Sequence, residues 1–268
     1  MKDWILNTIL DKEAGSLEAM AMGLAGVNII TGHTAARINS NLPGEVSGVT
    51  LDDGRLIHCE MVVVAIGVRP RLDTVVESGL KVNRGITVDR HMAASAPDVY
   101  ACGDVAEAYD FIIGGNRLTP VWPNAYNGGR VAGLNMAGQT AEYEGGTAMN
   151  SLKYFGLHIV SAGLVAPPND SYETITKKID SAYRKVILRN GRLAGLVFTG
   201  DIEKSGIVYN LMKDGADVSN FKKALVADDF GLAYLPKNLR QARLLMPEEA
   251  AGPGVTGLEE PEVLPVGD

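Results

Sequence analysis

The sequence lacks the features that mark several protein classes. Its 268 residues include only two cysteines, Cys59 and Cys102, in neither Cys-x-x-Cys nor metal-ligand spacing. A disulfide framework is therefore excluded, and both thiols are expected to be small buried hydrophobes rather than redox groups. No apolar run approaches the length of a membrane span, and the opening residues 1–4 do not resemble a signal peptide. We expect a cytoplasmic protein that does not contact the membrane.

An excess of basic residues is also missing. Lys and Arg number 25 against 32 Asp and Glu, and the net charge of −7 argues against a nucleic-acid surface. Residues 247–268 hold six carboxylates, four prolines and no base, which predicts a solvated, disordered tail. No metal site is predicted, because the four histidines are isolated from one another and from carboxylates at helical spacing. These are His33, His58, His91 and His158.

The remaining composition is that of an ordinary globular chain. It is 46% hydrophobic and 21% charged, with a mean hydropathy of +0.04, which suits one large or two modest domains. The central stretch is Asp98–Asp104, in which residues 99–101 suit a buried strand that stops at Gly103. Asp104 then follows at the carboxyl end of that strand, where open α/β sheets bind ligands.

A helix is expected about twenty residues later, from Trp122 to Gly133. Its first turn offers free N–H groups and a partial positive charge. A carboxylate at a strand tip would thus face a helix N-terminus. Two alternatives remain from the residues alone: Asp104 as a helix N-cap, and residues 125–135 as a surface helix packed on a sheet.

Upstream of this stretch, the pattern predicts a helix over residues 16–24 and a strand over residues 27–32. An antiparallel meander should follow, with its strands at residues 34–38, 46–51 and 55–58. The run Met61–Ile66 is continuously apolar and β-branched, so it reads as a strand buried on both faces, ending at Gly67 and residues 68–70. It is either a plain core strand or a strand tip near a ligand.

Beyond Gly146 the pattern changes to an α+β unit. Asn190-Gly191 is a strong hairpin turn between the last two of four expected strands. Amphipathic helices are predicted at residues 202–213 and 218–226. The expected strands span residues 157–163, 172–179, 182–188 and 193–199.

Five motifs in this order resemble the flavoproteins with two dinucleotide-binding domains. They are the meander, Val62–Pro70, Gly85–Asp89, Ser95–Asp104 and Ala125–Gly138. More narrowly, residues 11–239 resemble the FAD-dependent NAD(P)H oxidoreductases of the pyridine nucleotide-disulphide group. The resemblance implies FAD and NAD(P)H as cofactors. It also implies an α/β fold: a partial two-dinucleotide-binding-domain flavoprotein with Rossmann-like pieces and a β-meander, followed by an α+β carboxyl-terminal interface domain.

The resemblance also implies roles for single residues. Asp104, after Gly103, would hold the ribityl chain of FAD, and residues Asn124, Ala125 and Tyr126 would face the pyrimidine side of the flavin ring. Gly67 would end the strand that closes the NAD-binding domain. These roles make physical sense, because a fixed carboxylate accepts from hydroxyl groups and a helix N-terminus stabilises the negative charge of a reduced flavin.

The family's motifs are not all present. No Gly-x-Gly-x-x-Gly follows a predicted strand and opens a helix, so we expect the chain to begin partway through the NAD domain. We also expect it to lack the pyrophosphate contacts and the NAD site that it would need to catalyse the reaction by itself. No His-Pro with a downstream Glu supplies the acid-base pair of the disulphide reductases. The branch of NADH oxidases, ferredoxin or rubredoxin reductases and the flavin part of nitrite reductase fits better, and no catalytic residue is assigned.

We therefore expect hydride transfer from NAD(P)H to FAD and onward to an acceptor that the sequence does not name. The alternatives are a non-catalytic assembly subunit that docks a chain carrying the missing motifs, and a truncated product. Expected partners are a second copy, bound through the carboxyl-terminal domain, and either such a chain or an electron-acceptor protein. The expected domains are an NAD-domain remnant (1–80), an FAD-domain part (81–146), the interface domain (147–246) and the tail (247–268).

Overall fold

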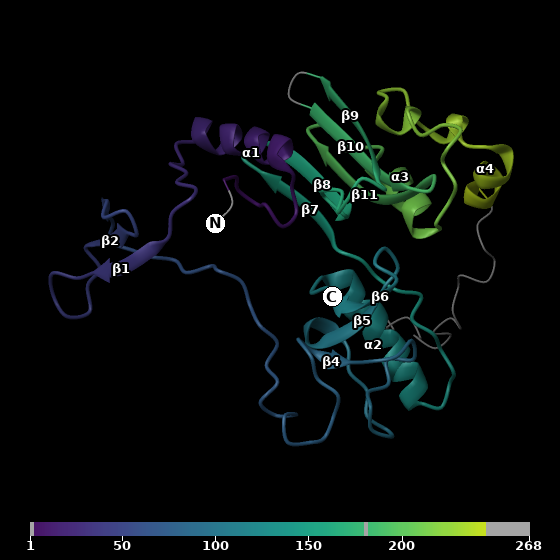
Figure 1. Cartoon of the computed structure of the whole chain (residues 1–268), viewed down its shortest axis with the longest axis horizontal. Helices are drawn as coiled ribbons and strands as arrows, with labels where there is room; N and C mark the ends of the chain where they lie inside the picture. The colour runs from purple at the N-terminus through teal and green to yellow at the C-terminus, as the bar shows by residue number, and fades with distance from the viewer. Residues whose placement is uncertain (1–2, 180–181, 245–268) are drawn as a thin grey trace, which may run out of the picture.

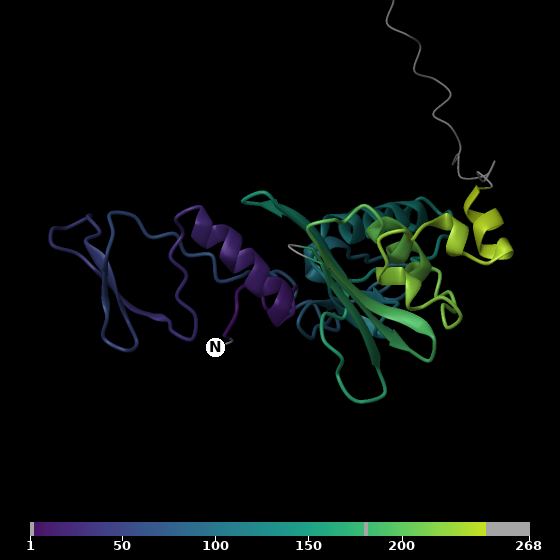
Figure 2. The same ribbon diagram turned by 90° about the horizontal axis from the view of Figure 1, so that it is seen from above.

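The computed structural model describes residues 3–179 and 182–244 and arranges them in three parts (Figure 1). A small meander lies at one end, away from the rest, and a helix joins it to a large antiparallel sheet (Figure 2). A third part, built on a short sheet and one long helix, lies beside the large sheet. The expected tail falls outside the described residues.

The meander confirms its sequence prediction. It pairs β1 (Ala35–Asn39), β2 (Gly48–Leu51) and β3 (Leu56–His58) antiparallel in chain order. The turn Asp52–Gly54 joins β2 to β3, with Gly54 at φ +87°, a left-handed conformation that glycine adopts without strain. Only β2 is substantially buried, so this sheet has little core of its own.

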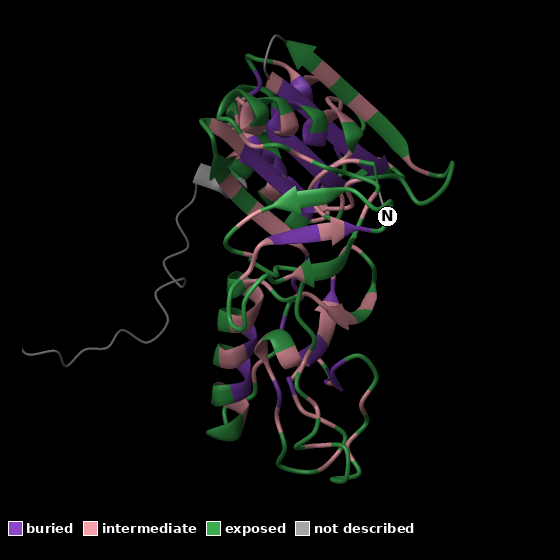
Figure 3. Cartoon of the chain, turned by 90° about the vertical axis from the view of Figure 1, so that its left-hand side faces the viewer, coloured by how far each residue is buried: buried purple, intermediate pink, exposed green. Residues whose placement is uncertain are grey.

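The middle part holds a three-stranded sheet in the order β4-β5-β6. Its strands are β4 (Ile86–Thr87), β5 (Ala106–Asp110) and β6 (Gly115–Leu118); β4 and β5 are parallel, and β5 and β6 antiparallel. The 15-residue helix α2 (Trp122–Met136) packs its buried side against this part, as the purple stripe in Figure 3 shows. The core includes Val88, Met92 and Val131.

The carboxyl-terminal part is a five-stranded antiparallel sheet in the order β7-β8-β11-β10-β9. Its two-residue hairpin loop Asn190-Gly191 has φ +51° and +73°, as the sequence predicted for that turn. Helix α3 (Ser205–Lys213) covers one face, and α4 (Lys237–Leu244) follows later in the chain. The strands are β7 (Met149–Tyr154), β8 (Leu157–Gly163), β9 (Glu173–Ile179), β10 (Ala182–Arg189) and β11 (Arg192–Thr199).

The opposite face of this sheet is covered by α1 (Lys12–Leu24). Leu10, Ala14 and Leu17 are buried there in one cluster with Ile159, Tyr183 and Val197. Asp11 caps α1, accepting from the backbone N–H of Ala14, and also accepts from the Tyr183 hydroxyl at 2.7 Å and from Lys185 Nζ at 2.8 Å. A half-buried salt bridge and a capping bond therefore dock the helix on β10.

The structure corrects the prediction for Met61–Ile66. This run is not a strand, and its side chains are open to solvent: Val63 is 80% exposed and Ile66 92%. The physical reason is the lack of neighbouring strands among the described residues, because a strand buried on both faces needs hydrogen-bonding partners at both edges. Residues 27–32, also predicted as a strand, have no regular structure either.

Two further predictions were wrong in detail. The strand expected at residues 99–101 is only an isolated bridge between Ala93 and Tyr100, and the strand β5 comes after Asp104 rather than before it. The helix expected at 218–226 is reduced to a 3₁₀ turn at Ala224–Val226. Among the described residues, no helix is both long and apolar enough to cross a membrane.

Candidate functional site

Gly103 and Asp104 lie in a 3₁₀ turn (Gly103–Val105) that leads into β5. Gly103 has φ +74°, and a Cβ added to it would stand 3.8 Å from the Cβ of Ala125 on α2. The structure thus brings together Gly103 and the first turns of α2, as the sequence predicted. The Asp104 side chain is exposed, and within residues 3–179 and 182–244 no hydrogen bond or ion pair to it is found.

This geometry argues against the capping alternative for Asp104. The N-cap position of its own turn is Cys102, with no side-chain capping bond, and the N-cap of α2 is Val121. Val121 offers no side-chain acceptor to α2, so the positive end of this helix dipole is not neutralised by a cap. The Asp104 carboxylate is therefore available to a ligand. The start of α2 offers its dipole rather than several free donors, because Pro123 has no N–H and the N–H groups of Asn124 and Ala125 donate to the Val121 carbonyl.

Glycines on α2 allow the helix to approach the turn closely. A Cβ at Gly128 would lie 3.0 Å from the terminal methyl of Met92 and 3.5 Å from Cys102 Cβ, and one at Gly129 would lie 3.8 Å from Cys102 Sγ. Cys102 is half-buried under the helix. The small residues at 128 and 129 therefore hold α2 against the turn that carries Asp104.

The three residues expected at the flavin ring differ in their surroundings. Asn124 donates its side-chain amide to the carbonyls of Thr119 at 3.4 Å and Thr147 at 3.3 Å, so this group already has a structural use. Ala125 is half-buried beside Gly103, and Tyr126 is 73% exposed. The backbone N–H of Asn124 is also used, because it donates to the carbonyl of Val121 at 3.1 Å.

An open hollow of about 840 Å³ contains Asp104. Val105, Leu118 and Pro120 form its apolar wall. The loop that follows Gly67 forms the rest of the lining, from Val68 to Leu72, together with Arg84. Gly67, at φ +97°, therefore lies one residue from the lining. The hollow has the volume of a small-molecule site.

A second hollow, of about 470 Å³, lies between α2 and α3. Asn127 and Arg130 line it from α2, and Tyr209 and Lys213 from α3. Tyr143, on the same lining, is buried, which raises the pKa of its hydroxyl to about 12, with a smaller contribution from the charge of Asp110. This tyrosine stays neutral across the physiological range.

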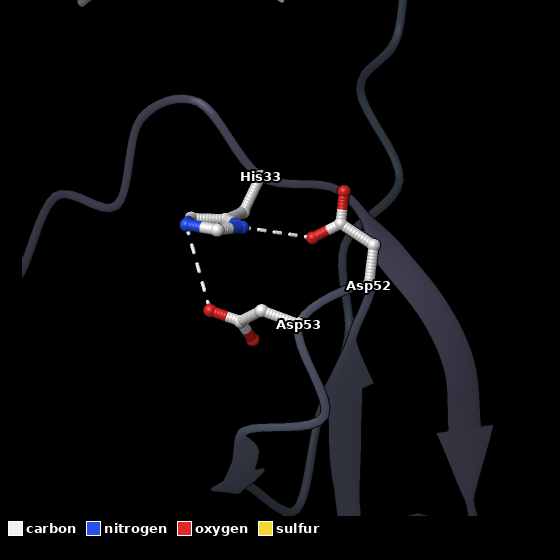
Figure 4. A group of neighbouring side chains, drawn as sticks. All are labelled: His33, Asp52 and Asp53. Atoms are coloured by element: carbon white, nitrogen blue, oxygen red, sulfur yellow. Dashed lines mark hydrogen bonds and ion pairs between the residues drawn. The ribbon is translucent and has the colours of Figure 1, made fainter.

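The meander holds a cluster that the sequence spacing did not reveal (Figure 4). His33 Nδ1 lies 2.9 Å from Asp52 Oδ1, and its Nε2 lies 3.4 Å from Asp53 Oδ2. The hydrogen bond with His33 lowers the pKa of Asp52. Asp53 also pairs with Arg55 Nε at 2.6 Å. Each ring nitrogen of His33 lies close to one of the two carboxylates, so the three side chains hold the turn together.

Sequence reasoning missed several lining residues. Arg69 and Pro70 were noted only as the end of a strand, and nothing marked Arg84, Leu118 or Pro120. Position is the one sequence signal for two of them: Arg84 directly precedes the motif Gly85–Asp89, and Pro120 lies two residues before the expected helix start at Trp122. Leu118 has no such signal. The spacing Gly-x-Gly-x-x-Gly does occur once, at Gly252–Gly257, outside the described residues and without the predicted strand before it.

Two family descriptions match the chain. Residues 1–145 match the pyridine nucleotide-disulphide oxidoreductase family. Residues 149–216 match the carboxyl-terminal domain of rubredoxin NAD⁺ reductase. Together they extend over both the part that carries Asp104 and the five-stranded sheet.

Known proteins support the same relationship. The chain is 30% identical to the nitrite reductase [NAD(P)H] of Bacillus subtilis over 82% of its own length and 27% of that protein. It is 31% identical to the NADH-rubredoxin oxidoreductase of Clostridium acetobutylicum, over 75% of this chain and 47% of the relative. The solved NAD-dependent persulfide reductase of A. fulgidus superposes with a TM-score of 0.74 at 22% identity, covering 91% and 49% of the two chains. The chain thus spans half or less of these proteins.

Proposed function

Because the chain belongs to the pyridine nucleotide-disulphide oxidoreductase family, we propose that it forms part of an FAD-dependent NAD(P)H oxidoreductase. In this function FAD takes a hydride from NAD(P)H and passes electrons to an acceptor. The main observation behind this proposal is the hollow that is lined by Asp104 and by the loop after Gly67. It lies near the N-terminus of α2, because Gly103 lies beside Ala125.

The residues present fit a flavin by their chemistry. The unpaired Asp104 carboxylate can accept hydrogen bonds from a row of hydroxyl groups. Leu118, Pro120 and Val105 offer an apolar wall to a flat ring, and this wall excludes water from one side of it. The uncapped N-terminus of α2 favours negative charge nearby, so it would stabilise the reduced ring without gaining or losing a proton.

The structure supports binding and orientation by this chain, but among the described residues that line the hollow only Asp104 could act as an acid or base. The proposed role of the described residues is therefore to hold the ribityl and ring-edge parts of FAD. An acceptor protein is part of the proposal because a relative is named NADH-rubredoxin oxidoreductase. The rival proposal is an assembly subunit that joins a chain carrying Gly-x-Gly-x-x-Gly loops; the exposed apolar run 61–66 favours it.

The test is flavin binding by the full chain. Titration with FAD, followed by the change in flavin absorbance and fluorescence, should give a dissociation constant above micromolar, because no pyrophosphate loop contributes. Asp104→Asn should weaken binding about tenfold, the lower end of the range for a charged hydrogen bond, since this side chain is exposed. Asp98→Asn, outside the hollow, is the control. Absence of binding, or equal affinity in Asp104→Asn, would contradict the assignment.

We also propose that the carboxyl-terminal part forms a homodimer, as its family resemblance implies. A second copy is not needed to cover the sheet face that α3 leaves open, because α1 packs on that face. A second copy would have to meet another surface, such as the edge strand β7 or β9. Sedimentation equilibrium at micromolar concentration should show a dimer, and a monomer would reject the proposal.

A further inference from the structure

Arginines gather at the hollow that contains Asp104. Three of them, Arg69, Arg71 and Arg84, line it, although the chain as a whole has a net charge of −7. Arg69 lies on the loop after Gly67, and Arg84 directly precedes Gly85 and β4. Two separate segments, residues 69–71 and the residue before Gly85, therefore place positive charge at one cavity.

Two of these guanidinium groups have no partner in the part of the chain that the structure describes. Arg71 donates from Nε to Asp73 at 2.8 Å, so its charge is matched locally. No ion pair or side-chain hydrogen bond of Arg69 or Arg84 is found among residues 3–179 and 182–244. Two like charges at one cavity repel each other, and an anion bound between them would offset this repulsion.

Arg84 is held in place by its backbone. The Glu107 carboxylate accepts from the backbone N–H of Arg84 at 2.7 Å and of Gly85 at 3.0 Å, and also from the Asn83 side chain at 3.3 Å. Glu107 is 5% exposed, so this clamp is a buried one. The position of Arg84 at the rim is thus fixed by three hydrogen bonds, while its guanidinium is left to a ligand.

The lining combines three kinds of contact: an apolar wall, the Asp104 carboxylate for hydroxyl groups, and the two unpaired guanidiniums. A planar guanidinium matches the oxygens of a phosphate with two parallel hydrogen bonds. We propose that Arg69 and Arg84 form an anion subsite for the phosphate of a phosphorylated, hydroxyl-bearing ligand. The inference rests on the proposed function in that the flavin cofactor is one source of this phosphate; a nicotinamide dinucleotide is the other.

The experiment compares ligands that differ only in phosphate. Riboflavin, FMN, FAD, ADP-ribose and inorganic pyrophosphate are titrated into the full chain at low ionic strength. The double variant Arg69→Gln/Arg84→Gln is compared with Lys153→Gln/Arg189→Gln, which removes the same charge from the carboxyl-terminal sheet. Circular dichroism confirms that each variant is folded.

We expect FMN to bind the wild type at least about tenfold more tightly than riboflavin, since charge-assisted hydrogen bonds are the stronger ones. The double variant should abolish this difference and leave riboflavin affinity unchanged, whereas the control should retain it. Raising the salt concentration should weaken FMN binding but not riboflavin binding, a second readout that needs no variant.

The outcomes separate the two proposals. Equal affinity for riboflavin and FMN would overturn the anion subsite and leave flavin binding intact. Arginine-dependent binding of pyrophosphate or ADP-ribose without any riboflavin or FMN binding would support the subsite and reject the flavin function. A phosphate preference that survives in the double variant would overturn the subsite.

Discussion

Glu18 is an ionisable residue that is fully buried. It lies on α1 with 0% exposure, and neither carboxyl oxygen has a hydrogen-bond partner in the described part of the chain. On the facing strands, Ser161 and Thr199 also have unsatisfied hydroxyl groups. They lie two residues after Ile159 and Val197, which contact α1, so they point to the same face of the sheet. Burial raises the pKa of Glu18, which favours its neutral form.

This burial predicts a pH dependence of stability. The folded state holds the Glu18 proton more tightly than the unfolded state, so the free energy of unfolding should fall as pH rises above the ordinary value of 4.5. Two ion pairs, Asp11–Lys185 and Glu13–Lys178, also lie between α1 and the sheet. Urea titrations from pH 4 to 8 should show a steeper decline for the wild type than for Glu18→Gln.

Glu13→Gln provides the control for that comparison. It removes an exposed carboxylate of the same helix that pairs with Lys178, so it should not reduce the decline. Parallel pH profiles for the wild type and Glu18→Gln would mean that Glu18 is not the titrating group.

At this scale the sequence predicted that Gly103 and Asp104 lie near Ala125, because a Gly-Asp turn and a helix start can each be recognised locally, although the strand expected before Gly103 is absent. It could not predict that the Asn124 side chain is used by the carbonyls of Thr119 and Thr147, since Thr147 is 23 residues away. The His33 cluster was missed for the same reason: 19 residues separate His33 from Asp52.

At the scale of elements, contacts with the sheet determine which side chains of α1 are buried and which are exposed. Leu17 is 7% exposed in the cluster with Val197, whereas Met20, one turn later, is 57% exposed. Leu17→Ala should destabilise the docking of α1 by about 2–5 kcal/mol, the usual cost of emptying a buried leucine site. Met20→Ala should cost less than about 0.5 kcal/mol.

Hydrogen exchange of the α1 amides measures this docking directly, because local opening controls their protection. Faster exchange in Leu17→Ala but not in Met20→Ala is the expected result. Equal exchange in both variants would show that α1 is not held by the sheet.

Elements with a local signal were predicted well. The meander and the Asn190-Gly191 hairpin depend on turn residues that lie within a few positions of their strands. The run 61–66 was wrongly predicted to be a buried strand, because burial depends on neighbouring strands that a local sequence pattern does not reveal. Strand β7 was missed because its alternation is weak: Met149–Tyr154 mixes polar and apolar residues on both faces.

At the scale of the molecule, the segment between β3 and β4 joins the meander to the middle part without regular secondary structure. Residues 59–85 contain no helix or strand, and most of the apolar side chains of this segment are exposed. The parts on either side have their own structure: the meander and α1 before it, and two packed clusters after it. The expected boundary between residues 80 and 81 lies at the end of this segment.

Limited trypsin digestion should therefore cut first after Arg71, whose side chain is 83% exposed, or after Lys81. Cleavage after Arg69 is blocked by Pro70. The two products should stay together in gel filtration and separate only in denaturant, because α1 of the first is docked on the sheet of the second through Leu10, Ala14 and Leu17. FAD should slow the cut at Arg71, which lines the hollow. A first cut within residues 86–136, or immediate separation of the products, would contradict this division of the chain.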